Sequence, residues 1–333
     1  MPFRIYNWVE IANDYNRGSL LLGNGASMAI DDRFGYSSII EYARDHGLLT
    51  DDIEQLFCFF NTADFELVLR LVWQASNVNR SLRIPDERTH AAYVRVRECL
   101  IQSVRDIHPE HQEISRDLPA IYNFIKRFST VISLNYDLII YWAIMYGTRI
   151  NDNHLLKDCF VSRRFYENWR NLRESFFYGQ SVTLVFYPHG NLVLCRNNVE
   201  AEFKITNHEH GLLETVLREW QSEQVVPLFV SEGTAWQKIN SIQNSSYLNT
   251  VYREVLTSLE DHLVIYGWGL WPQDEYILQR IVSSGIRKIA VSVYRNDQAY
   301  CNRVYDTIIR ILGVNVQVDF FNSESPNCWN NID

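Results

Sequence analysis

The stretch Ser19-Leu20-Leu21-Leu22-Gly23-Asn24-Gly25-Ala26-Ser27 joins a short apolar run to a glycine turn and then to a helix-like segment. An apolar run without alternation is typical of a parallel strand that is covered on both faces. Glycines directly after such a strand let the backbone come close to a ligand or to a neighbouring turn. The stretch therefore predicts the first strand-to-helix unit of an α/β fold.

Similar apolar runs recur along the chain and alternate with helical patterns, as a doubly wound sheet requires. The further strands that we predict are Val131–Leu134, Val182–Tyr187, Val226–Val230, His262–Tyr266, Lys288–Val293 and Asn315–Phe320. The helices that we predict between them include Asp137–Tyr146, Ser246–Leu259, Asp274–Ser283 and Asp297–Leu312. We expect a three-layer, Rossmann-like α/β fold with a mostly parallel sheet, formed by residues 1–333 as a single domain.

The spacing between the first two strands is unusual, because more than 100 residues separate them. A crossover needs only about a dozen residues, and a structureless loop of such length is rare. The interval carries the helical patterns Ser37–His46, Asp51–Phe60, Asp64–Asn79, Glu87–Ile107 and Ile114–Phe128. We therefore predict a helical insertion over residues 37–128, placed where it could cover a ligand site.

Composition and charge argue against a nucleic-acid-binding protein and against a membrane-spanning one. The 333 residues include 31 Lys and Arg against 40 Asp and Glu, a net charge of −9, which argues against direct nucleic-acid binding. The longest apolar stretch, Leu138–Tyr146, is far shorter than the ~20 residues that span a bilayer. The N-terminus lacks the apolar core of a secretory signal, and the six cysteines form no C-x-x-C pair. We expect a cytoplasmic protein without a membrane segment, a disulfide framework or a cysteine zinc site.

Small and polar residues cluster where three of the predicted strands end. The clusters are Gly23-Asn24-Gly25-Ala26-Ser27, Ser133-Leu134-Asn135-Tyr136-Asp137 and Tyr187-Pro188-His189-Gly190-Asn191. Because the carboxyl ends of parallel strands line the ligand crevice, we expect the clusters to converge on one edge of the sheet. Each also has a structural interpretation, as a tight turn, a helix cap or a satisfied histidine. A dinucleotide fingerprint would need a third glycine where Met28 stands, which weakens an ordinary dehydrogenase interpretation.

These motifs occur in an order that resembles a known family. Gly23-Asn24-Gly25-Ala26-Ser27, Asn135-Tyr136-Asp137, His189-Gly190 and Gly267-Trp268-Gly269 resemble the sirtuin-like family, especially its divergent bacterial branch of NAD-consuming defence effectors. The segments Pro227–Gly233 and Ser245–Leu248 also look like parts of that branch. The predicted helical insertion has no counterpart that we can match.

The resemblance implies roles for individual residues. Those that would cradle the NAD pyrophosphate are Gly23, Asn24, Gly25 and Ser27. Asn135 and Asp137 would hold the nicotinamide ribose and a water, and His189 would be the base. A degraded version of the family's cofactor-loop motif D-F-R is formed by Asp32, Arg33 and Phe34. The residues that would lie near the adenosine half are Gly267, Trp268 and Tyr294, although the family usually has a small hydroxyl residue in place of Trp268.

The chemistry of NAD cleavage is consistent with these residue types. Breaking the nicotinamide glycosidic bond develops positive charge on the ribose, as in other glycoside hydrolyses. An amide such as Asn135 offers both a donor and an acceptor, which suits it to orient a water or a ribose hydroxyl. His189 could take a proton, and the Asp137 carboxylate could stabilise the cationic ribose.

The resulting functional prediction is an NAD glycohydrolase that releases nicotinamide and ADP-ribose. Protein-deacylating sirtuins carry a four-cysteine zinc module, and its absence here disfavours deacylation. We interpret His208-Glu209-His210, and His108 with His111, as solvated loops, so no metal and no cofactor beyond NAD as substrate is expected.

The resemblance further implies abortive infection in anti-phage defence, controlled by a co-encoded sensor or regulatory protein or by homo-oligomerisation. The alternative prediction is a non-catalytic subunit that senses NAD or ADP-ribose within a larger complex. Such a subunit would keep the glycine turn but tolerate the loss of Asn135 or His189, and the presence of both favours an enzyme.

Overall fold

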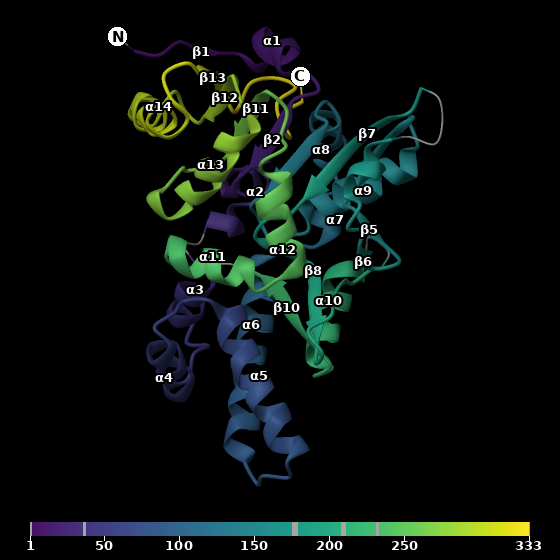
Figure 1. The fold of residues 1–333 in the computed structure, drawn as a ribbon, viewed down its shortest axis with the longest axis vertical. Helices are drawn as coiled ribbons and strands as arrows, with labels where there is room; N and C mark the ends of the chain where they lie inside the picture. Colours follow the sequence, from purple (N-terminus) through teal and green to yellow (C-terminus); the bar gives the residue numbers. More distant parts are fainter. Residues whose placement is uncertain (1, 36–37, 175–178, 208–210, 231–232, 333) are drawn as a thin grey trace.

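A central parallel sheet organises the computed structural model, which describes residues 2–35, 38–174, 179–207, 211–230 and 233–332 (Figure 1). Its eight strands lie in the order β1 (Ile5–Tyr6), β13 (Gln317–Asn322), β12 (Lys288–Val293), β11 (His262–Tyr266), β2 (Ser19–Leu22), β3 (Thr130–Ser133), β7 (Ser181–Phe186) and β4 (His154–Lys157). Every neighbouring pair in this sheet is parallel. The predicted α/β class with a mostly parallel, Rossmann-like sheet is confirmed.

The strands at the centre of the sheet are buried along their whole length. All four residues of β2 and all four of β3 are buried, the polar Ser19, Thr130 and Ser133 included, because helices cover both faces of the sheet. The flanking helices that follow strands of the sheet are α9 (Ile139–Ile150), α13 (Glu275–Ile281) and α14 (Gln298–Leu312). The predicted helix Ser246–Leu259 is shorter than expected: α12 (Ser246–Thr250) continues as a π-helical turn that ends at Val255.

Helices fill the interval between β2 and β3. After α2 (Asn24–Met28) and a 3₁₀ turn (Asp32–Gly35) come α3 (Ile39–Asp45), α4 (Asp51–Phe60), α5 (Phe65–Ser81), α6 (Glu87–Ile107), α7 (His111–Ile114) and α8 (Leu118–Ile125). The bounds predicted for α4 and α6 are confirmed, while Ser37, the predicted start of the first of these helices, lies outside the described residues. The prediction of one helix over Ile114–Phe128 is wrong, because the chain breaks between α7 and α8 and restarts with a proline in the first turn of α8.

A second, antiparallel sheet corrects the assignment of one strand. Val226–Val230 was predicted as a strand of the parallel type, but β10 (Val225–Phe229) pairs antiparallel with β8 (Gly190–Asn197), which also pairs with β9 (Glu202–Lys204). All of β10 is buried, since it packs against α5 and α10 (Leu212–Gln221). A strand that is covered on both faces has an unbroken apolar sequence whether its neighbours are parallel or antiparallel, so the sequence pattern does not distinguish the two cases.

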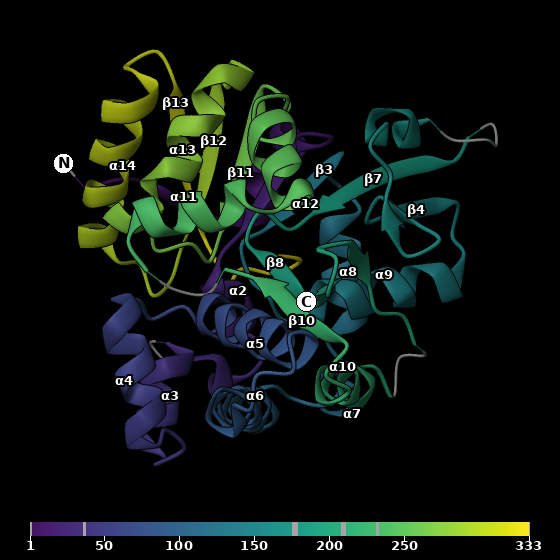
Figure 2. The same cartoon turned by 60° about the horizontal axis from the view of Figure 1, so that its bottom comes forward.

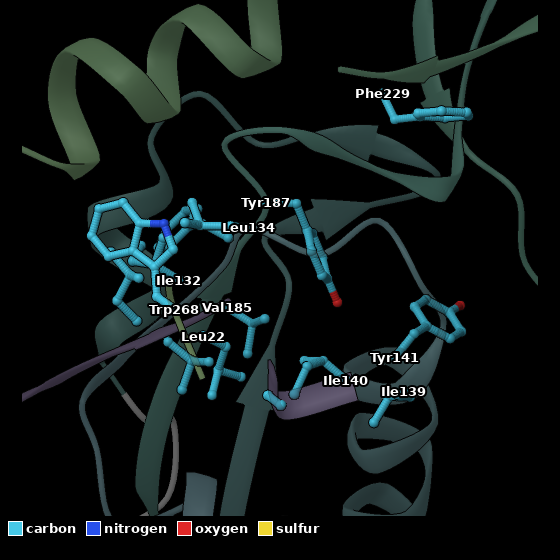
Figure 3. Close-up of a cluster of buried hydrophobic side chains, with 14 of the residues drawn as sticks. Leu22, Ile132, Leu134, Ile139, Ile140, Tyr141, Val185, Tyr187, Phe229 and Trp268 are labelled. Atoms are coloured by element: carbon cyan, nitrogen blue, oxygen red, sulfur yellow. The ribbon is translucent and has the colours of Figure 1, made fainter. Parts of the chain in front are cut away.

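The small sheet lies between the central sheet and the helices α3 to α6, which gather on one side of the molecule (Figure 2). The remaining described elements are α1 (Trp8–Ile11), the β5 (Phe160–Val161) and β6 (Arg164–Phe165) hairpin, α11 (Ala235–Gln243) and 3₁₀ turns at Ala12–Tyr15, Trp169–Arg173, Pro272–Asp274 and Val282–Ser284. Figure 3 shows part of the core, where Leu22, Ile132 and Val185 from neighbouring strands meet the helix residues Ile139 and Ile140. In the described part of the chain, no helix is both long and apolar enough to cross a membrane.

Candidate active site

A cavity of about 530 Å³ opens at the carboxyl ends of the central strands. Most of the residues predicted for the site line it: Gly23, Asn24, Gly25, Phe34, Asn135, Asp137, His189, Gly267 and Trp268. The structure thus brings the ends of β2, β3, β7 and β11 together around one space. Four other residues predicted for the site are not among the described residues that line the cavity: Ser27, Asp32, Arg33 and Tyr294.

The glycine turn after β2 is packed against the turn after β11. The N–H of Gly23 donates to the Tyr266 carbonyl at 3.0 Å, and the N–H of Gly25 donates to the Gly267 carbonyl at 2.7 Å. A Cβ on Gly25 would lie 2.8 Å from that same oxygen, and one on Gly267, whose φ is +67°, would lie 2.3 Å from a neighbouring backbone nitrogen. The close approach of two backbones therefore requires these glycines. The N–H groups of Gly23 and Gly25 donate to protein carbonyls and that of Gly267 donates to Ser292 Oγ at 2.9 Å, so none of the three is left for a ligand.

Asn135, Ser27 and Asp137 form a hydrogen-bonded network at the cavity wall, in which Ser27 and Asp137 are buried and Asn135 is half-buried. The Asn135 Nδ2 donates to the Gly23 carbonyl at 3.0 Å and to Ser27 Oγ at 2.8 Å. Ser27 Oγ in turn donates to Asp137 Oδ2 at 2.5 Å. Both amide hydrogens of Asn135 are thereby used, which fixes the orientation of the amide, and Asn135 Oδ1 accepts no hydrogen bond from a described residue. Because Asn135 lines the cavity, this oxygen is the acceptor that the network leaves to a ligand.

Asp137 is both a helix cap and a member of this network. Its Oδ1 accepts the Ile139 N–H at 2.9 Å in the first turn of α9, and its side chain is buried. Burial raises the pKa of Asp137, while the hydrogen bonds from Ser27 and the α9 backbone lower it. The carboxylate is thus bonded to Ser27 and to the α9 backbone, and the residue also lines the cavity.

His108 and His111 contradict the prediction that they lie in solvated loops, because both are buried. His108 Nε2 accepts the Leu138 N–H at 3.0 Å, and the rings of His108 and His111 each meet the Trp142 ring edge-on with centroids 5.4 Å apart. Burial lowers the pKa of His108 to about 4, which keeps the ring neutral and able to accept this hydrogen bond. His108 thus supports the start of α9 next to Asp137.

His189 lies in the turn between β7 and β8. Its carbonyl accepts the Val230 N–H at 2.7 Å, and the next residue, Gly190, has a φ of +77° with no room for a Cβ beside the Leu228 carbonyl. The imidazole is buried; its Nε2 contacts the Tyr276 hydroxyl, and the ring also has a hydrogen bond to the Leu134 backbone. Burial, with the nearby Lys238 ammonium, lowers the pKa of His189 to about 4. The ring is therefore neutral at physiological pH.

Sequence reasoning missed several residues of the site. Lys238, on α11, and Asp274, just before α13, line the cavity and form an ion pair at 2.7 Å. Tyr276, the partner of His189, was also missed, and Trp271 and Gln273 complete the wall near Asp274. The sequence around Asp274 signals only a helix start, and nothing local connects it with a lysine in a different helix.

Of the residues predicted for the cofactor loop and the adenosine side, Asp32, Arg33 and Tyr294 are not among the described residues that line the cavity, whereas Phe34 is. Arg33 forms ion pairs with Asp31 at 2.8 Å and with Glu113 at 2.7 Å, while Asp32 lies in the same 3₁₀ turn. Phe34 lines the cavity, and its carbonyl accepts Asn24 Nδ2 at 3.0 Å. Tyr294 is 56% exposed.

Trp268, which replaces the expected small residue, is buried against the glycine turn. A Cβ on Gly23 would lie 2.6 Å from the Trp268 Cα. The Trp268 Nε1 has no hydrogen-bond partner in the described part of the structure, although Trp268 lines the cavity. Trp268 therefore supplies mainly an apolar wall to this end of the cavity.

Potential metal ligands do not gather at the site. Among the residues that the structure describes, no group of three or more His, Cys, Asp or Glu side chains could hold a metal ion. The segment His208-Glu209-His210 lies outside the described residues. Of the cysteines, Cys58 is exposed and the others are buried at separate places in the fold.

Comparison with known proteins assigns the chain to a family. A family model described as "Domain of unknown function (DUF4917)" matches residues 20–329. The chain belongs to this family. No curated protein matches the chain.

Solved structures of sirtuins match at low identity. One, of a Sir2 mutant with a p53 peptide and NAD, is 13% identical, with 86% of this chain and 84% of that chain covered and a TM-score of 0.36. Another, titled "Structural Basis for the Mechanism and Regulation of Sir2 Enzymes", is 11% identical, with 89% and 93% covered and a TM-score of 0.34. A third, on sirtuin substrate affinity, is 13% identical, with 86% of each chain covered and a TM-score of 0.33.

Proposed function

We propose that this chain is an NAD glycohydrolase, which uses water to cleave NAD into nicotinamide and ADP-ribose. The observation that carries the proposal is the fixed amide of Asn135. Its donor half is held by Gly23 and Ser27, so its Oδ1 is the acceptor at the cavity, in a wall that also contains His189. An acceptor held in one orientation can orient a water or a ribose hydroxyl without reorganisation during the reaction.

The proposed reaction breaks one bond and forms another. The bond between the ribose C1′ and the nicotinamide nitrogen breaks, and its electron pair neutralises the pyridinium ring. Positive charge builds up on the ribose, as at an oxocarbenium centre. The water oxygen, hydrogen-bonded to Asn135 Oδ1, bonds to C1′, and its proton passes to the imidazole of His189. Asp137 contributes the negative charge behind Ser27 and keeps the Asn135 amide in place.

The walls of the cavity would bind the rest of the dinucleotide. The turn of Gly23, Asn24 and Gly25 lies beside the turn of Gly267 and Trp268, and Phe34 closes the side towards the helices. Because the Gly23 and Gly25 N–H groups already bond to carbonyls, pyrophosphate contacts would have to come from other groups of these turns. We assign Asp32, Arg33 and Tyr294 to the outer part of the site, and Ser27 to the support of Asn135.

A non-catalytic NAD or ADP-ribose sensor is the second candidate, and one observation favours it. His189 Nε2 contacts Tyr276 and does not stand free to take a proton from a water. A binding-only protein would tolerate this arrangement. It would not need the Asn135 acceptor to be held in one orientation, which is why hydrolysis remains our first proposal.

We further propose a biological role on the basis of the sequence resemblance alone. The chain would deplete NAD in the cytoplasm of a phage-infected bacterial cell and cause abortive infection. Its control would come from a co-encoded sensor or regulatory protein, from homo-oligomerisation, or from both. Residues 37–128 would form an insertion into a single domain and cover the site.

Product analysis tests the proposed reaction. Purified protein is incubated with NAD, alone and with extract of phage-infected bacteria, and the products are separated by chromatography. We expect nicotinamide and ADP-ribose, and we expect Asn135→Ala and His189→Ala to abolish both. The matched variants Asn302→Ala and His46→Ala, at exposed positions, should keep the activity. If NAD binds but stays intact under every condition, the proposal of a hydrolase is wrong and the sensor becomes the better proposal.

A further inference from the structure

Tyr276 occupies one nitrogen of the His189 ring. The Tyr276 hydroxyl contacts His189 Nε2, and the His189 ring has its other hydrogen bond with the Leu134 backbone. A neutral imidazole has one donor and one acceptor nitrogen. Because the Leu134 backbone favours a proton on the ring, we assign that proton to Nδ1, so that Nε2 accepts the Tyr276 O–H.

The contact between Tyr276 and His189 is made inside the protein. His189 lines the cavity, whereas Tyr276 is absent from the described residues that line it and is only 3% exposed. The two rings are 6.0 Å apart between centroids and inclined by 35°. The lone pair that a general base needs is therefore directed into the protein and is occupied there.

Tyr276 lies two residues after Asp274, which forms an ion pair on the cavity wall. Tyr276 lies in the first turn of α13, and Asp274 immediately before this helix forms its ion pair with Lys238. Both members of that pair line the cavity. An anionic group of a bound dinucleotide would compete with Asp274 for Lys238 and so loosen the start of α13.

We propose that Tyr276 is a positioning residue that restrains His189, and that His189 becomes available as a base only when α13 moves and withdraws the Tyr276 hydroxyl. This inference rests on the proposed hydrolysis of NAD and adds a means of regulation to the same site. A protein that contains both Asn135 and His189 would then be inactive as long as the Tyr276 hydroxyl occupies His189 Nε2. It also places the trigger at the Lys238–Asp274 pair on the cavity wall.

The test compares Tyr276→Phe with the full-length wild-type chain. The variant loses only the hydroxyl, and Tyr252→Phe is the matched control, because the Tyr252 ring packs against Tyr276 with centroids 6.0 Å apart and has no contact with His189 among the described interactions. Two readouts are used: the ¹⁵N shifts of the His189 imidazole, assigned with His189→Ala, and the rate of NAD cleavage.

We expect Tyr276→Phe to change the Nε2 shift towards that of a nitrogen without a hydrogen bond and to speed NAD cleavage about threefold to tenfold, the population effect of one lost hydrogen bond. Tyr252→Phe should change neither. An unchanged Nε2 shift overturns the proposal whatever the rate does. Where the wild type cleaves NAD measurably, a released Nε2 with an equal or lower rate also overturns it, since removing the Tyr276 hydroxyl would then bring no gain. If Nε2 is released but neither protein cleaves NAD, the restraint stands and the proposed hydrolysis fails.

Discussion

Replacing Ser27 by alanine removes the hydroxyl that joins Asn135 to Asp137 inside the protein. The lost hydrogen bond to the Asp137 carboxyl, at 2.5 Å, is of the kind that contributes about 1.5–3 kcal/mol when the acceptor is charged. The bond from Asn135 Nδ2, at 2.8 Å, is between neutral groups and contributes about 0.5–1.5 kcal/mol. Ser27 is only 1% exposed, so water does not replace the hydroxyl easily. We expect the free energy of unfolding to fall by about 2–4 kcal/mol at pH 7.

The loss should depend on pH in a defined direction. Burial raises the pKa of Asp137, and the Ser27 hydroxyl opposes this, so the pKa should rise further in Ser27→Ala. A carboxyl whose pKa is higher in the folded state than in the unfolded state destabilises the fold progressively as the pH rises from the unfolded value, about 3.9, through the folded value. The difference in unfolding free energy between wild type and Ser27→Ala should therefore grow as the pH is raised.

Urea unfolding at several pH values between 4 and 8, followed by tryptophan fluorescence, measures this effect. Ser103→Ala is the control, because Ser103 is equally buried but its hydroxyl donates to the neutral Cys99 carbonyl at 2.9 Å. Its cost should be about 1 kcal/mol and independent of pH. A Ser27→Ala cost below about 0.5 kcal/mol, or one with the flat pH profile of Ser103→Ala, would refute a charged network behind Asn135.

Three further predictions concern the surroundings of the cavity. Gly25→Ala should destabilise the fold by more than about 2 kcal/mol in urea unfolding, because its Cβ would lie 2.8 Å from a backbone oxygen, whereas Gly35→Ala, whose Cβ would meet only a methionine methyl at 3.6 Å, should be nearly neutral. Lys238→Met should raise the pKa of His189 above about 4 in an NMR titration, because the ammonium that lowers it is lost and a carboxylate is left unpaired; an unchanged pKa would contradict the proximity of these groups. Trp329→Phe should cost about 1 kcal/mol of unfolding free energy through loss of the indole hydrogen bond to a carbonyl in α2, at 2.8 Å, and an equal stability would show that this bond contributes nothing.

Local patterns were sufficient for most of the secondary structure. The strands Ser19–Leu22, His262–Tyr266 and Lys288–Val293 have the predicted bounds, because a short apolar run bounded by turn residues describes a buried parallel strand well. The same pattern failed for β10, since burial against α5 and α10 produces an identical run in an antiparallel sheet. Burial along a sequence is readable, whereas the direction of the neighbouring strand is not.

The candidate site divides in the same way. The order of the strand ends was enough to predict that Asn135 and His189 approach the glycine turn, because parallel strands place their carboxyl ends at one edge. The buried positions of His108 and His111 could not be predicted, since their partners on and before α9 are distant in the sequence. The places of Lys238, Asp274 and Tyr276 in the site could not be predicted for the same reason.

The sequence by itself determined the α/β class, most of its strands and some of the residues that meet at the cavity, such as Asn135 and His189. Only the tertiary structure decided how the polar groups there are used. It commits the Gly23 and Gly25 N–H groups to carbonyls, uses the Asn135 Nδ2 to bond Gly23 and Ser27, and turns His189 Nε2 towards Tyr276. The physical reason is that periodicity along a chain records which side chains are buried, while each hydrogen bond depends on a donor and an acceptor that the fold brings together from distant segments.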